Sequence, residues 1–174
     1  MFITDSHLHS SESLDFIGLT KSTPDNEIFT QAKIVISKDE SDSLFQFVEL
    51  LRKGDGVPVD KSEAIKYYKM SIEKGNDNAM VNYANMLKKG DGVPVDKSEA
   101  IKYYKMSIAK GNVFAMFNYA IMLDDGDGVP FNKSEAIKYY KMSAEKGNTN
   151  AMNNYAYMLY NGDGVPVNKS EAII

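Results

Sequence analysis

The sequence contains no cysteine and no tryptophan, and only two of its 174 residues are histidines. Without cysteine the chain can form neither a disulfide framework nor a thiolate metal site, which fits a reducing compartment. It also lacks an apolar run near the ~20 residues that cross a bilayer. Its N-terminal residues lack the basic and apolar segments of a signal peptide. We therefore expect a cytoplasmic protein without a membrane partner.

An excess of positive charge is also missing. The chain has 20 lysines and arginines against 24 acidic residues, a net charge of −4. Proteins that bind nucleic acids or anionic lipid surfaces generally present a basic face, so we expect no nucleic-acid partner. The hydrophobic content of 43% and the charged content of 25% are typical of a folded domain.

One twelve-residue pattern appears four times in the last three quarters of the chain. It reads GDGVPVDKSEAI from Gly54 and again from Gly90, GDGVPFNKSEAI from Gly126, and GDGVPVNKSEAI from Gly162. The prolines of the four copies lie 36 residues apart, at Pro58, Pro94, Pro130 and Pro166. A fixed period between 20 and 50 residues indicates a solenoid or another repeat array.

The first helix of each copy, called here the B helix, follows the proline. In the first copy, Asp60 and Glu63 form a capping box, and Gly75 supplies a left-handed stop. These signals predict a helix over residues 61–74. Its apolar stripe recurs at the helical spacing of four residues, at Ala64, Tyr68 and Ile72.

A second helix, called here the A helix, follows in each copy. Asn76 can cap it and Gly90 ends it, with an apolar stripe at Ala79, Tyr83 and Leu87. Each unit is therefore predicted to be a pair of antiparallel helices. Neither helix can bury its apolar stripe alone, so neighbouring units must stack.

The array does not account for the whole chain. Residues 1–23 are polar and serine-rich, and we expect them to be disordered. Residues 24–41 are predicted to form a degenerate capping helix, and residues 42–174 an array of three full helix pairs and a truncated fourth. The fourth B helix starts at Lys169, which predicts an uncapped C-terminal end that either continues in a longer array or allows self-association.

The unit resembles the Sel-one-like repeat, a relative of the tetratricopeptide repeat. The residues that carry the resemblance are Ala79, the loop 90–93, Asp96, Ala100, Tyr103, Tyr104, Ser107 and Gly111. Tyr83, Ala84 and Leu87 depart from the family pattern, which usually has Leu, Gly and Tyr there. The resemblance implies an all-α fold, a right-handed superhelical solenoid of antiparallel helix pairs with a 36-residue period. It also implies a non-catalytic role as an adaptor or scaffold.

The copies differ from one another mainly on one face of the A helix. Core positions must interdigitate with neighbouring units, so a divergent face indicates contact with something outside the array, or a solvated face that has drifted. The tetratricopeptide resemblance implies that this face lines a concave groove and that its asparagines contact a peptide backbone. The candidate partner-binding residues are Val81, Asn82, Asn85, Lys88, Phe117, Asn118, Ile121, Asn153, Asn154 and Tyr157.

Motifs for catalysis are weak or missing. Asp5, His7 and His9 match the opening of metal-dependent amidohydrolases, but the sequence holds no further histidine for such a site. The acidic residues of the repeat lack calcium-loop spacing, and its glycines form no phosphate loop. We therefore expect no catalytic residue, no metal and no cofactor.

The sequence thus predicts a non-catalytic scaffold that binds a peptide or partner protein along the concave A-helix face. Two alternatives stay open. The chain could be a regulatory or targeting module of a longer enzyme whose catalytic domain lies outside this sequence. It could also be a self-assembling structural array, joined through its C-terminal end.

Overall fold

The computed structural model describes residues 41–54 and 58–172. Within these residues the chain is all-α, with seven helices and no strand, which confirms the predicted fold class. The expected disordered segment 1–23 lies outside the described residues. So does the expected capping helix at 24–41, apart from Ser41, where the first described helix begins.

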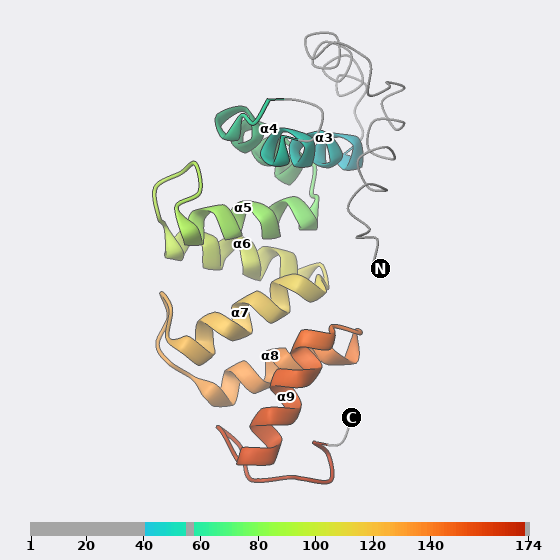
Figure 1. Ribbon diagram of the computed structural model, residues 1–174, viewed down its shortest axis with the longest axis vertical. Coiled ribbons are helices and arrows are strands. Elements are labelled where there is room, and N and C mark those ends of the chain that lie inside the picture. Colours follow the sequence, from blue (N-terminus) through green and yellow to red (C-terminus); the bar gives the residue numbers. More distant parts are fainter. Residues whose placement is uncertain (1–40, 55–57, 173–174) are drawn as a thin grey trace, which may run out of the picture. The chain divides into compact units, whose positions relative to one another are not determined.

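The chain divides into two compact units. The boundary between them falls inside a helix, between Ala79 and Met80. The first contains α3 (Ser41–Lys53), α4 (Lys61–Glu73) and the start of α5 (Asp77–Lys89). The second contains the rest of α5, α6 (Lys97–Ala109), α7 (Val113–Asp125), α8 (Lys133–Glu145) and α9 (Thr149–Asn161). The odd-numbered helices are A helices and the even-numbered ones are B helices (Figure 1).

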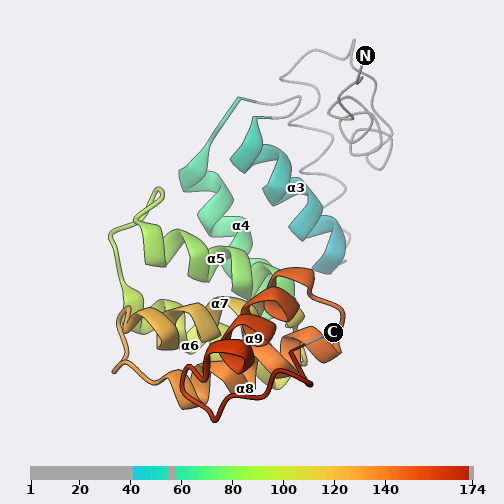
Figure 2. The same cartoon turned by 60° about the horizontal axis from the view of Figure 1, so that its bottom comes forward.

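Within each unit, helices adjacent in the sequence pack side by side. In the first unit α3 packs on α4, and in the second α6 packs on α7, α7 on α8 and α8 on α9 (Figure 2). In the second unit A and B helices therefore alternate through the packing, in the order α6, α7, α8 and α9. Every helix that the structure describes is 13 residues long, a length that is marginal for an isolated helix in water. Their stability therefore comes from packing.

The predicted capping residues start the helices. The backbone N–H groups of Glu63 and Glu99 each donate to the N-cap aspartate three residues earlier, at 2.9 Å. Asn112 and Asn148 cap α7 and α9 in the same way, through N–H groups two or three residues later. These bonds satisfy donors that have no partner inside the helix.

Alanine and tyrosine form the core of each B helix. The alanine of the repeat is fully buried in the three described B helices, α4, α6 and α8, and the second tyrosine of each pair is at most 1% exposed, as the sequence predicts. The buried serine one turn later in α8 is explained by a hydrogen bond. Ser143 donates its hydroxyl to the backbone carbonyl of Val113 at 2.8 Å, which ties α8 to the start of α7.

The loop motif packs against the preceding copy of the repeat. In the second unit, Asp127 pairs with Lys97, and Asp163 pairs with Lys133. The bond from Lys97 holds the pKa of Asp127 below its ordinary value. In each pair the lysine is the first residue of the B helix 30 residues earlier in the sequence. The motif therefore joins successive copies as well as ending the A helix.

Candidate functional site

The divergent face of the A helices contacts the buried tyrosines of the B helices. In the first unit the Tyr68 hydroxyl donates to Glu49 of α3. In the second unit the Tyr104 hydroxyl donates to Oδ1 of Asn85 at 2.5 Å. Burial raises the pKa of Tyr104 above its ordinary value, with a smaller contribution from Asp127, so the hydroxyl stays protonated as a donor. Glu49 and Asn85 occupy the same register position, 36 residues apart.

Asn85 also accepts a second bond. The side-chain amide of Asn118, on α7, donates to the same Oδ1 atom at 3.3 Å. One asparagine oxygen thus joins α5, α6 and α7. Asn85 and Asn118 were expected to bind a partner directly, but their side chains are already engaged within the chain.

In the next copy the hydroxyl of the buried tyrosine has different partners. Ile121 occupies the register position of Asn85 and offers no hydrogen-bond acceptor. The Tyr140 hydroxyl interacts instead with Asn154 of α9 and Asp124 of α7, and burial raises its pKa to about 12. Burial also raises the pKa of Asp124. An acceptor side chain is therefore present at the position of Asn85, where it bonds to the buried tyrosine hydroxyl, and absent at Ile121, where the hydroxyl has other partners.

The remaining candidate residues differ widely in exposure. Val81 is only 5% exposed, which leaves little of its side chain for a partner to contact. Asn82 is half-buried. Lys88 lies 3.6 Å from Asp127, with a quarter of its side chain exposed. Phe117 and Ile121 are half-buried, and the Phe117 ring centroid is 5.9 Å from that of Tyr140.

The most accessible part of the face is on α9. Tyr157 is 66% exposed, and Asn153, one turn earlier, is also exposed. Tyr160, one turn after Tyr157, is 55% exposed and lies under the ammonium of Lys169, 4.8 Å from its ring centroid. Tyr160 was not among the selected candidates, although its spacing of three residues from Tyr157 is a signal that the sequence carries.

The bridge through Asn85 leads to a stability prediction. Tyr104→Phe should lower the free energy of unfolding by about 1–2 kcal/mol, because the variant loses the hydrogen bond and leaves the Asn85 oxygen less well satisfied. The matched change Tyr157→Phe removes an exposed hydroxyl and should have almost no effect. Urea unfolding followed by circular dichroism measures both. Equal effects of the two changes would contradict the bridge.

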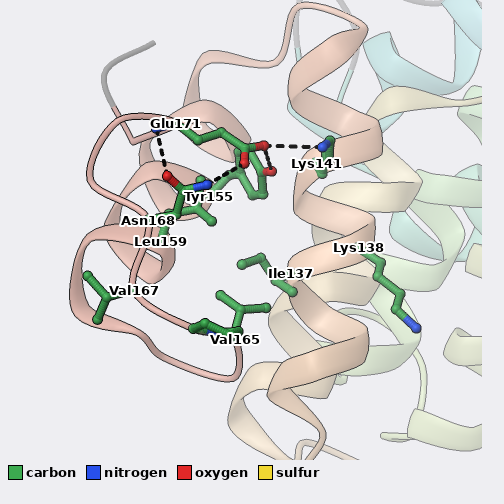
Figure 3. A pocket seen from close by; sticks show the side chains of 10 residues that line it. Ile137, Lys138, Lys141, Tyr155, Leu159, Val165, Val167, Asn168 and Glu171 are labelled. Carbon is green, nitrogen blue, oxygen red and sulfur yellow. Dashed lines mark hydrogen bonds and ion pairs between the residues drawn. The ribbon is translucent and has the colours of Figure 1, made fainter.

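A second feature is a pocket of about 470 Å³ beside the end of α9, called here the end pocket. Tyr155 lines it, and its hydroxyl donates to Glu171 at 2.5 Å. Lys141 of α8 also pairs with Glu171, at 3.2 Å (Figure 3). The lining residues are Ile137, Lys138, Lys141, Tyr155, Leu159, Val165, Pro166, Val167, Asn168 and Glu171.

Neither a metal centre nor a membrane span is found in the described part of the chain. Among residues 41–54 and 58–172, no three acidic, histidine or cysteine side chains gather closely enough to hold a metal ion. The motif at Asp5, His7 and His9 lies outside these residues. No helix in the same ranges is long and apolar enough to cross a bilayer.

Short helix pairs, joined in the second unit by recurring side-chain contacts, define a helical repeat protein. The model of the Sel1 repeat matches residues 49–76, 77–112, 113–148 and 149–174. These segments cover most of the chain, which therefore belongs to the Sel1 repeat family, as the resemblance predicted. Proteins of this family are generally non-catalytic scaffolds for protein interaction.

Several solved structures share the fold. A protective antigen of uropathogenic Escherichia coli is 26% identical with a TM-score of 0.78, and the match covers 83% of this chain and 31% of the antigen. A Sel1 repeat protein from Oxalobacter formigenes is 24% identical with a TM-score of 0.82, over 94% of this chain and 66% of that one. Cysteine-rich protein B of Helicobacter pylori is 16% identical with a TM-score of 0.58, over 77% and 96%.

This chain thus spans about a third of the antigen and 66% of the Oxalobacter protein. A search of curated proteins found no match.

Proposed function

We propose that this protein is a scaffold that binds a segment of a partner protein across the A-helix face of its second unit, on α7 and α9. The observation that carries the proposal is the exposure of Tyr157, 66% exposed on a face where the copies of the repeat differ. Large exposed aromatic side chains mark binding surfaces, because their burial by a partner contributes much of the binding energy. Family membership supports the same role.

The residues of this face divide by role. Tyr157 and Asn153 are the proposed direct contacts, because they are exposed. Phe117 and Ile121 are half-buried and would extend the apolar contact along α7. The asparagines that bond within the chain would act by holding the A helices in place; they are Asn85, Asn118 and Asn154.

The test compares two exposed aromatic residues of the second unit. The tagged protein and its Tyr157→Ala and Phe131→Ala variants are used to capture partners from the native cell extract, with identification by mass spectrometry. Phe131 is 62% exposed but lies in the loop after α7, off the A-helix face. We expect a set of proteins to be lost at least tenfold with Tyr157→Ala and retained with Phe131→Ala.

Folding must be controlled in the same experiment. Both changes remove exposed rings, so the melting temperatures should stay within about 2 °C of the parent protein. Phe117→Ala is a poorer probe, because the Phe117 ring packs near Tyr140 and its loss would also affect stability. If capture is the same for both variants, the A-helix face is not the binding surface.

A further inference from the structure

The B helices of the second unit present the same exposed residues in each copy of the repeat. Two lysines and a methionine are spaced by three and one residues, so they share one helix face. All six side chains are exposed. These residues, called here the lysine face, are Lys102, Lys105 and Met106 on α6 and Lys138, Lys141 and Met142 on α8.

Exposed residues of the A helices in the same unit are not constant. Phe114 of α7 becomes Asn150 in α9, and Asp125 becomes Asn161, although all four residues are exposed. Both helices belong to the same repeat and have had the same opportunity to diverge. Packing does not explain constancy at exposed positions. The lysine face therefore meets the same chemical group in every copy, whereas the A-helix face meets a different group in each.

The two halves of the lysine face lie near one another. The Lys105 ammonium of α6 is 5.2 Å from the ring centroid of Tyr119, and that ring is 5.0 Å from the ring of Tyr139 on α8. Burial raises the pKa of Tyr139, and the positive charge of Lys105 partly opposes this effect. A Cβ atom on Gly111, just after α6, would lie 3.8 Å from the Lys146 ammonium, just after α8. The lysines of α6 and α8 thus form one patch.

This patch is strongly basic, although the whole chain has a net charge of −4. Helices α6 and α8, with the lysine that caps each C-terminus, carry eight lysines and three glutamates. Lys97 and Lys133, at the helix starts, pair with loop aspartates. Four other lysines have no carboxylate partner among the described residues: Lys105, Lys110, Lys138 and Lys146. The net charge does not reveal this separation, because most acidic residues of the second unit lie in its loops and at the end of α7.

We propose that the lysine face docks on a membrane surface containing anionic phospholipids, with its lysines at the headgroups and its two methionines at the boundary with the acyl chains. A membrane offers the same anionic group to each copy, which matches the constancy of this face. A folded partner protein would offer a different side chain to each copy. The proposal concerns a different surface from the A-helix face, so it does not rest on the function proposed above.

The composition of the face favours lipid over nucleic acid. Proteins that bind single-stranded nucleic acids stack bases on aromatic rings and use arginine. The lysine face contains neither, and the only arginine of the chain, Arg52, lies on α3 in the first unit. Met106 and Met142 are 40% and 41% exposed. Such apolar side chains gain from contact with acyl chains, while long lysine side chains reach outward to the headgroups.

The test is sedimentation of the full chain with lipid vesicles. We expect binding to phosphatidylcholine vesicles that contain about 30% phosphatidylserine, and none to vesicles of phosphatidylcholine alone. Raising the salt concentration from about 0.05 M to about 0.5 M should release the protein, because salt screens the attraction. Tyr157→Ala, on the A-helix face, should leave vesicle binding unchanged, so failure of this proposal is distinguishable from failure of the other.

Matched charge changes locate the surface. Each lysine near an anionic surface strengthens binding about fivefold. The double change Lys105→Gln and Lys138→Gln should therefore weaken vesicle binding at least tenfold. The double change Lys89→Gln and Lys169→Gln alters the net charge equally, but Lys89 ends α5 and Lys169 lies over the Tyr160 ring. This control should weaken binding less than twofold.

A second pair of variants tests the methionines. Met106→Gln combined with Met142→Gln should weaken vesicle binding at least threefold, because the face loses its apolar contact with the bilayer. Phe114→Gln, which removes a ring that is 61% exposed on α7, should leave binding unchanged. All of these side chains are exposed, so the melting temperatures should stay within about 2 °C of the parent protein.

Three results would overturn the proposal. The first is absence of binding to the phosphatidylserine vesicles at low salt. The second is an equal loss for the two double lysine variants, which would reduce the effect to overall charge. The third is tighter binding to a single-stranded oligonucleotide or to polyglutamate than to vesicles, lost with Lys105→Gln and Lys138→Gln, which would assign the lysine face to another polyanion.

Discussion

Replacing Ala100 by aspartate is expected to unfold the second unit at temperatures where the parent protein is folded. Ala100 lies in the first turns of α6 and is fully buried. Its side chain faces the core, where an aspartate would place a carboxylate without a paired cation. Burying such a group should cost about 3–5 kcal/mol or more. Domains of this size are stable by only about 5–15 kcal/mol, so the loss is a large fraction of the total.

Thermal unfolding followed by circular dichroism measures the effect, and Ala109→Asp is the control. Ala109 is exposed at the last position of α6, so the same substitution there buries no charge. It should cost less than about 1 kcal/mol, through the unfavourable position of an acid at a helix C-terminus. Cooperative unfolding of Ala100→Asp at the parent temperature would refute the packing described for α6.

Gly128→Ala is the second change with a large expected effect, because two costs add at this glycine. Gly128 has a φ of +77°, which a residue with a side chain rarely adopts. In addition, a Cβ atom at this position would lie 2.6 Å from the Cβ of Lys97, which cannot swing away as the end of a side chain can. Together these effects should lower the free energy of unfolding by about 2–4 kcal/mol.

Gly147→Ala separates the two costs. Gly147 also has a positive φ, +96°, but a Cβ there would meet nothing within 4 Å. This variant carries the backbone cost alone, about 1–2 kcal/mol. Urea unfolding should therefore show a clearly larger loss for Gly128→Ala than for Gly147→Ala. If the losses are the same, the loop does not approach the preceding B helix as closely as described.

The helices could be predicted from the sequence because their signals are local. Asp60 and Glu63 are three residues apart, and the bond that starts α4 joins these same two residues. Gly126 ends α7 with a φ of +67°, a conformation that glycine adopts without steric cost. Such interactions need only a short stretch of backbone, so a single copy of the repeat is enough to show them.

The exposure of the candidate residues on the divergent face could be predicted only in part. The variation among copies singled out Tyr157, and the structure places this residue in solvent. The same variation also singled out Asn85, whose side chain is occupied by Tyr104 and Asn118. Sequence divergence cannot separate these cases, because a position can vary when it faces a partner and also when each copy satisfies a buried hydroxyl in its own way.

By itself, the sequence determined the helices, their caps and stops, the buried alanine and tyrosine positions, and the family. These features depend on contacts between residues at most a few positions apart and on a pattern repeated four times. Only the tertiary structure decided which divergent residues are exposed to solvent. It also decided why Gly128 must lack a side chain and where a pocket opens beside Tyr155. Those features depend on atoms that lie 16 to 33 residues apart in the sequence and meet only after the helices have packed.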